Sequence, residues 1–233
     1  MAVAFDAATG SSGSGSTSLT FAHTCGGSDR KLVVGVGVRD SGSVAVTGVT
    51  YNGVAMTAVG TRQTNGIVKL DVYQLNAPAT GSNNVVVSMD GTPSSGVAGY
   101  AISLTGVDQG EAYDVQGGNA GSGTGAGSNG ETTVTTTDAN AWGVDFLWRR
   151  NDTEAIADAG QTDRGNVTLS TNTVLACSTE SLASPGSLVM GWGWTNSHSW
   201  THKLVAVGPS GGSPPPPAGW LGWYGGYGSA VNV

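Results

Sequence analysis

The side chains that could do chemistry are few, and they form no catalytic or metal-binding signature. The chain has three histidines, of which His198 and His202 stand four residues apart and would share one side of a strand. With a distant third histidine, His23, they lack the ligand spacing of a zinc site. No H-E-x-x-H motif and no Walker-type phosphate-binding loop occurs. We therefore expect no catalytic residue, no metal ion and no cofactor.

Three tryptophans are the best candidates for a ligand site. Trp192 and Trp194 are two residues apart, so a strand would turn both indoles to one face, and Trp200 follows soon after. Such a group could form the aromatic platform of a sugar-binding module, or it could pack as core at the end of a β-sandwich. Asp145 stands within an apolar run, where strand alternation would turn it away from the core or toward a neighbouring arginine.

The C-terminal segment, residues 209–233, differs in composition from everything before it. Four consecutive prolines favour a stiff polyproline II spacer of about 12 Å. Glycine-separated aromatic residues follow, and such side chains gain most when they are buried against another surface. We interpret the segment as an arm that leaves the domain and anchors on a neighbour, with folding back onto its own domain as the alternative. The expected partner-binding residues are Pro214, Pro215, Pro216, Pro217, Trp220, Leu221, Trp223, Tyr224 and Tyr227.

The composition is typical of short strands joined by tight turns, and it argues against several classes of function. Glycine makes up 39 of 233 residues, about 17% against a usual ~7%, and charged residues make up 11% against ~25%. The net charge is −7 and basic residues do not cluster, so we expect no nucleic-acid partner. No apolar run is long enough to span a membrane, and the first residues do not form a signal peptide.

The two cysteines do not form a disulfide framework. Cys25 and Cys177 fall in different halves of the chain, so a single bridge between the halves and two free thiols are both open.

Two strand-like runs organise the chain, residues 97–108 and residues 200–208. In the first, apolar or small side chains occupy both faces, which is typical of an inner strand covered on both sides. Within residues 31–39, Gly35 and Gly37 leave room on one face. The Asn52-Gly53 pair between two apolar runs predicts a tight hairpin, because both central residues of that turn need positive φ.

No segment has helical apolar periodicity, and the chain is expected to be all-β. The predicted fold is a two-sheet antiparallel sandwich of jelly-roll type over residues 1–208, followed by the extended arm. Two similar strand sets, 1–110 and 131–208, would be joined by a glycine-rich loop at 117–130, and residues 9–18 are expected to be a loop. Strands are expected at 1–6, 19–23, 31–39, 44–51, 54–59, 67–75, 85–89, 97–107, 132–136, 141–148, 173–180, 187–194 and 200–207.

Over residues 3–208 the sequence resembles a β-sandwich module of bacteriophage structural proteins and large bacterial surface proteins. The most specific parts are T-Y-N-G-V-A-M-T-A-V-G at 50–60 and A-I-S-L-T-G-V-D-Q at 101–109. The resemblance implies a jelly-roll-like sandwich used for decoration, cementing, tail or adhesion roles. It is carried by core and turn residues, so it implies a fold and no active site.

These observations together predict a non-enzymatic virion protein, specifically a capsid decoration or cement protein on the outer surface of the particle. It would assemble in the host cytoplasm, and its partners would be the major capsid protein and other copies of itself in a homo-oligomeric assembly. One alternative is a carbohydrate- or receptor-binding module of a phage tail or fibre. Another is a subunit of an extracellular filament or cell-surface layer.

Overall fold

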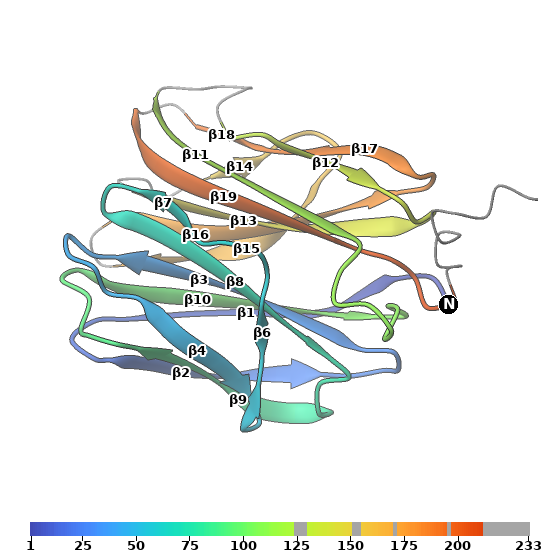
Figure 1. Ribbon diagram of the computed structural model, residues 1–233, viewed down its shortest axis with the longest axis horizontal. Coiled ribbons are helices and arrows are strands. Elements are labelled where there is room, and N and C mark those ends of the chain that lie inside the picture. The colour runs from blue at the N-terminus through green and yellow to red at the C-terminus, as the bar shows by residue number, and fades with distance from the viewer. Residues whose placement is uncertain (124–129, 151–154, 170–171, 195–196, 212–233) are drawn as a thin grey trace, which may run out of the picture.

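The computed structural model describes residues 1–123, 130–150, 155–169, 172–194 and 197–211. Within these ranges every regular element is a β-strand and all strand pairs are antiparallel, as the sequence predicts. The strands stack in four layers, with two inner sheets facing each other and an outer layer on each side (Figure 1). The described residues include no helix of the length and apolarity that a membrane span requires.

The first half of the chain builds one inner and one outer sheet. In the first inner sheet, β7 (Gln63–Asn65) pairs with β8 (Val68–Asn76). Across that sheet the order is β1 (Ala4–Gly13), β10 (Gly96–Thr105), β3 (Lys31–Arg39), β8 (Val68–Asn76) and β6 (Thr57–Ala58). Across the first outer sheet it is β2 (Ser18–Cys25), β9 (Gly81–Met89), β4 (Val46–Tyr51) and β5 (Val54–Ala55).

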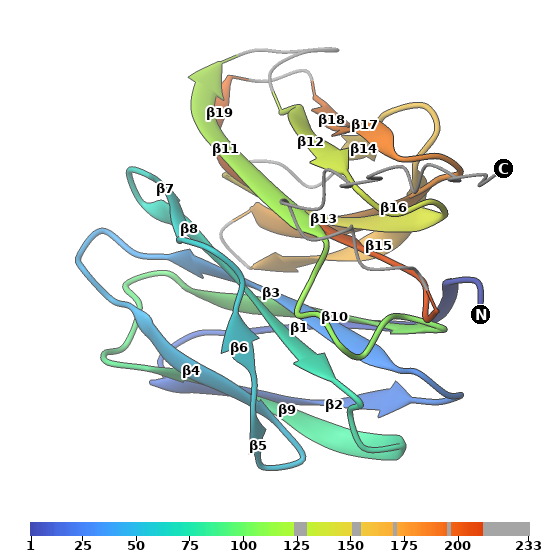
Figure 2. The same cartoon turned by 45° about the vertical axis from the view of Figure 1, so that its right-hand side comes forward.

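The second half repeats this plan, and Figure 2 shows its layers stacked above those of the first half. The second inner sheet runs in the order β11 (Val115–Gly123), β19 (His198–Val207), β13 (Ala141–Arg150), β16 (Thr173–Leu182) and β15 (Thr162–Leu169). The second outer layer consists of two strand pairs, β12 (Thr132–Thr136) with β17 (Gly186–Met190), and β14 (Ile156–Ala157) with β18 (Trp192–Gly193).

Seven strands of the first half have a counterpart in the second. β1, β2, β3 and β4 match β11, β12, β13 and β14 in chain order, and β8, β9 and β10 match β16, β17 and β19. In each inner sheet the last strand lies between the first and the third. The inner sheets of the two halves therefore have similar strand orders.

The largest hydrophobic core lies between the two inner sheets, so the halves share it. Phe146 and Trp148 of β13 pack against Gly35 and Gly37 of β3, where added Cβ atoms would overlap the aromatic rings. The Trp148 indole N–H donates to the carbonyl oxygen of Val38 at 3.1 Å. The room that the two glycines leave is thus filled by side chains from the other half.

Several sequence predictions are confirmed. β10 is an inner strand paired with β1 and β3, with Ala98, Tyr100, Ile102 and Leu104 in the shared core and Val97 and Ala101 in the core beneath the first outer sheet. The hairpin joins β4 and β5, and its central residues Asn52 and Gly53 have φ of 50° and 77°.

Three predictions about the strands and sheets are wrong, and one long strand was missed. The expected loop at 9–18 is strand as far as Gly13, and the expected linker at 117–130 is strand as far as Gly123, with residues 124–129 outside the described ranges. Both glycine-rich segments are edge strands whose backbone groups pair with β10 and β19, which needs no particular side chain. β15 was not predicted. The sandwich has more than the two sheets expected, because the two strand sets form separate sheets.

Candidate functional site

The structure brings the three predicted tryptophans together, but as buried side chains. Trp192, Trp194 and Trp200 are 1%, 3% and 4% exposed in an apolar cluster between the second inner sheet and its outer layer. The rings of Trp194 and Trp200 lie 5.6 Å apart and tilted by 52°. Arg149 places its guanidinium 4.8 Å from the Trp194 ring centroid. Their role as a ligand platform stays a prediction, since a ligand would have to reach side chains that are covered here.

The prediction for Asp145 is wrong, because this carboxylate points between the sheets of the second half and is fully buried. Trp192 Nε1 lies 3.0 Å and His202 Nε2 2.7 Å from its Oδ2 atom, while Ser178 Oγ donates to Oδ1 at 2.6 Å. The other ring nitrogen of His202 lies 2.9 Å from Thr132 Oγ1. Strand alternation places Asp145 on this side, and its three partners, which come from β16, β18 and β19, satisfy its charge.

This polar network divides the apolar packing of the second half into two clusters. The tryptophan cluster lies on one side, and a smaller cluster of Val134, Leu188, Met190, Leu204 and Ala206 lies on the other. The corresponding core of the first half is one continuous apolar cluster. The two halves therefore share a topology and differ in what they bury.

The first half has its own buried histidine, His23 on β2. Its ring nitrogens lie 3.1 Å from Thr9 Oγ1 and 3.1 Å from Ser103 Oγ, and Ser103 donates to Asp6 Oδ2 at 2.7 Å. Burial lowers the pKa of His23 to about 4, although the nearby Asp6 carboxylate opposes this shift. The imidazole is therefore neutral at pH 7, and its partners explain it as a satisfied core residue. It lies on β2 in the first half, whereas His198 and His202 lie on β19 in the second, so the three histidines form no common site.

The two cysteines are free and buried, in different cores. Burial raises the pKa of both thiols, that of Cys177 strongly. The structure thus has the free thiols and not the bridge that the sequence left open.

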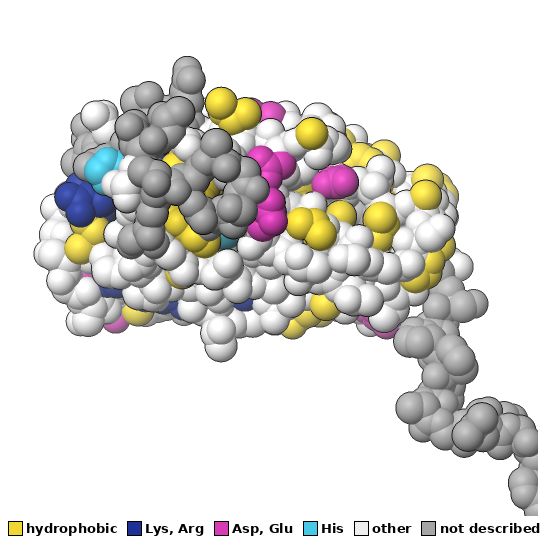
Figure 3. Space-filling view, turned by 90° about the horizontal axis from the view of Figure 1, so that it is seen from above, with side chains coloured by type: hydrophobic (Ala, Val, Ile, Leu, Met, Phe, Trp, Pro, Cys, Tyr) yellow, Lys and Arg dark blue, Asp and Glu magenta, His cyan; other side chains and the backbone are white. Residues whose placement is uncertain are grey.

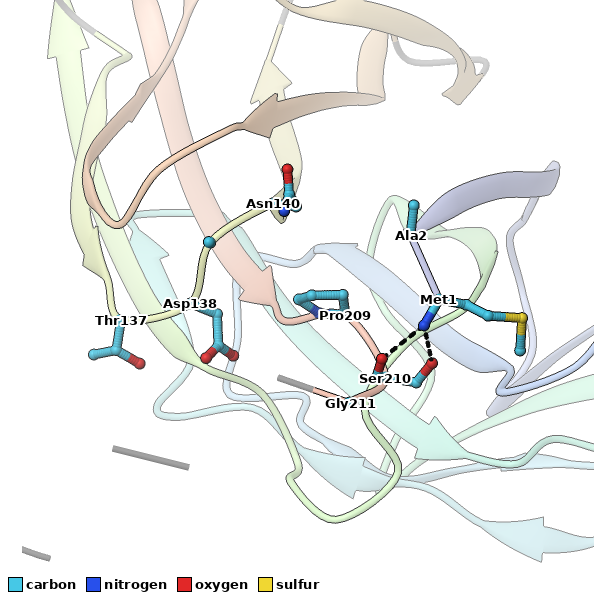
Figure 4. A pocket seen from close by; sticks show the side chains of 9 residues that line it. Met1, Ala2, Thr137, Asp138, Asn140, Pro209, Ser210 and Gly211 are labelled. Carbon is cyan, nitrogen blue, oxygen red and sulfur yellow. Dashed lines mark hydrogen bonds between the residues drawn. The ribbon is translucent and has the colours of Figure 1, made fainter. Parts of the chain in front are cut away.

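Several hollows open on the surface of the described chain. One of about 400 Å³ lies where the N-terminus meets the last described residues, beside Asp138 and Asn140 (Figure 4). The Met1 ammonium donates there to the backbone oxygen of Ser210 at 2.7 Å and to its hydroxyl at 3.0 Å. Burial and the nearby carboxylates of Asp114 and Glu111 raise the pKa of Asp138. Across the described ranges, no grouping of His, Cys, Asp and Glu could hold a metal ion.

The predicted arm begins beside this hollow. Pro209 forms a single bridge with Val107, and the described chain ends at Gly211. The proline spacer and the aromatic residues of the arm lie in residues 212–233, outside the described ranges, so their predicted contacts stay predictions.

Comparisons of the chain with protein-family models, with curated proteins and with solved structures found no match. The structure establishes the all-β fold of several antiparallel sheets. The resemblance to phage and surface modules stays a hypothesis, because none of the comparisons matches such a module.

Proposed function

We propose that this chain is a non-enzymatic structural protein of a bacteriophage particle, most specifically a capsid decoration protein. The observation that carries the proposal is the shared core, which joins two corresponding sandwiches into one block. The orders β1-β10-β3-β8 and β2-β9-β4-β5 support a jelly roll in the first half, and β11-β19-β13-β16 supports the same plan in the second.

The chemistry of the interior is consistent with a structural role. His23, His202 and Asp145 are buried, and their partners are core hydroxyls, an indole and each other. A general acid or base has to come within hydrogen-bond reach of a substrate, which the packed positions of His23, Asp145 and His202 do not offer.

In this proposal the block lies on the shell and the arm supplies the anchor. The arm follows Gly211, beside the N-terminus at one end of the block, and its sequence combines a stiff spacer with aromatic side chains. Aromatic anchors that fill pockets on a partner commonly dominate binding energy. Each bound copy would add buried area between shell subunits and so oppose expansion of the shell.

The test is co-sedimentation with capsid shells of the phage that encodes the chain. We expect the full chain to bind, a chain ending at Gly211 to stay folded without binding, and Trp220→Ala with Trp223→Ala to bind at least about tenfold more weakly. Matching circular dichroism spectra and melting temperatures would establish that each variant is folded. Unimpaired binding by the shortened chain would refute the anchoring role, and absence of binding by the full chain would refute the capsid role.

A second candidate is a carbohydrate- or receptor-binding module. It is favoured by the tryptophan cluster, in which Trp200 Nε1 is buried and has no hydrogen-bond partner in the described part of the chain. A glycan array comparing the natural chain with Trp200→Phe would test it, because this change removes the N–H and keeps an aromatic ring. Absence of any bound glycan, or equal binding by both proteins, would count against this site.

A further inference from the structure

The first outer sheet presents a face without charged side chains. Its strands β2, β9, β4 and β5 contain no Asp, Glu, Lys or Arg. In β2 and β9 exposed polar residues alternate with buried ones, so hydroxyl and amide groups point outward. Val86 lies in the middle, opposite Thr20 on one neighbouring strand and Thr50 on the other. A hollow of about 420 Å³ opens beside it, with Asn83 and Asn84 in its wall.

Charge is concentrated elsewhere on a chain whose net charge is −7. Figure 3 looks onto the opposite outer layer and shows Asp and Glu side chains gathered near its middle. Two of the acids in this half, Asp158 and Glu131, lie near each other. Burial and the nearby Glu131 carboxylate raise the pKa of Asp158. Two copies of such a chain repel each other where their acidic surfaces meet. The face of the first outer sheet avoids this repulsion.

We infer that the uncharged face of the first outer sheet binds the same face of a second copy of this chain. A two-fold contact of this kind uses one patch on both partners, and it is the commonest arrangement of soluble oligomers. It would turn both acidic outer layers away from each other. Hydroxyl and amide groups would hydrogen-bond across the contact, and Val86 and Ala22 would add apolar area at its centre. The inference concerns copies of this chain alone and does not depend on the capsid role.

The size of the face sets the expected strength. β2, β9, β4 and β5 have 8, 9, 6 and 2 residues, and a rise of about 3.4 Å per residue with strands about 4.8 Å apart gives a face of roughly 400 Å² per copy. The roughly 800 Å² contributed by two copies is smaller than a stable specific interface, so the contact is weak and transient. We therefore expect a dissociation constant between about 10⁻⁴ and 10⁻³ M.

The test uses the purified full chain and one side chain on this face. Asn84 is exposed on β9, and Asn84→Asp adds a charge with little change of shape. Sedimentation velocity from about 10 µM to 1 mM should show the natural chain forming dimers in this range. At low salt Asn84→Asp should weaken dimerisation at least about threefold, and about 0.5 M NaCl should reduce that loss.

Two controls separate a specific contact from a general effect of charge. Asn166→Asp makes the same change at an exposed position of β15, and it should leave dimerisation unchanged. An equimolar mixture of Asn84→Asp and Asn84→Lys should regain dimers, because opposite charges then face each other. The inference is refuted if the natural chain stays monomeric at 1 mM, or if Asn166→Asp weakens association as much as Asn84→Asp. Either result would leave the capsid proposal untouched, since no particles are present.

Discussion

Replacing Gly37 by alanine tests the core that joins the two halves. An added Cβ atom would stand 2.7 Å from Cε3 of Trp148, closer than packed carbon atoms approach. The ring cannot move away freely, because its N–H is held by the carbonyl oxygen of Val38. Overpacking of this kind costs about 1–3 kcal/mol, and the lower backbone entropy of unfolded alanine offsets about 0.5–1 kcal/mol. We expect a net loss of about 1–2 kcal/mol.

The assay is thermal unfolding of Gly37→Ala beside Gly48→Ala. A loss of this size should lower the melting temperature by about 2–8 °C in a chain of this length. Gly48 lies in β4 with open space where its Cβ would stand and without positive φ, so its replacement should be neutral or slightly stabilising. Adding Trp148→Phe should recover part of the loss in Gly37→Ala. Equal melting temperatures for the two alanine variants would refute the packing of Trp148 on Gly37.

Three further predictions concern buried polar groups. The pKa of His23 is about 4 in the folded chain, whereas the unfolded imidazole takes up its proton near pH 6.5. The free energy of unfolding should therefore fall by up to about 3 kcal/mol as the pH drops from about 6.5 to about 4. Acid-unfolding curves of His23→Gln should lack this component, and an unchanged curve would contradict it. Asp145→Ala leaves buried donors without their acceptor, and the free energy of unfolding measured in urea should fall by about 3–5 kcal/mol. An unaltered urea midpoint would show that the network contributes little to stability. The Cys177 thiol should react with Ellman's reagent only after unfolding, because it is buried with a raised pKa, and rapid reaction of both Cys25 and Cys177 in the native chain would argue against their packing.

The confirmed predictions depend on local chemistry. Asn52 and Gly53 form the hairpin because few residue types accept the positive φ that its turn needs. β10 lies inside because both of its faces are apolar or small, so that both gain from burial. The space left by Gly35 and Gly37 was also visible in the sequence, whereas the rings that fill it come from residues more than a hundred positions away.

The sequence by itself determined that the chain is all-β, where most of its buried strands lie and which turn joins β4 to β5. These properties follow from alternation, β-branched residues and turn chemistry, which act over a few residues. Only the tertiary structure decided that the glycine-rich segments at β1 and β11 are strands, because their order comes from backbone pairing with β10 and β19. Only it showed that Asp145 and the tryptophans face the interior, since the side of a strand that is buried depends on the sheet that covers it.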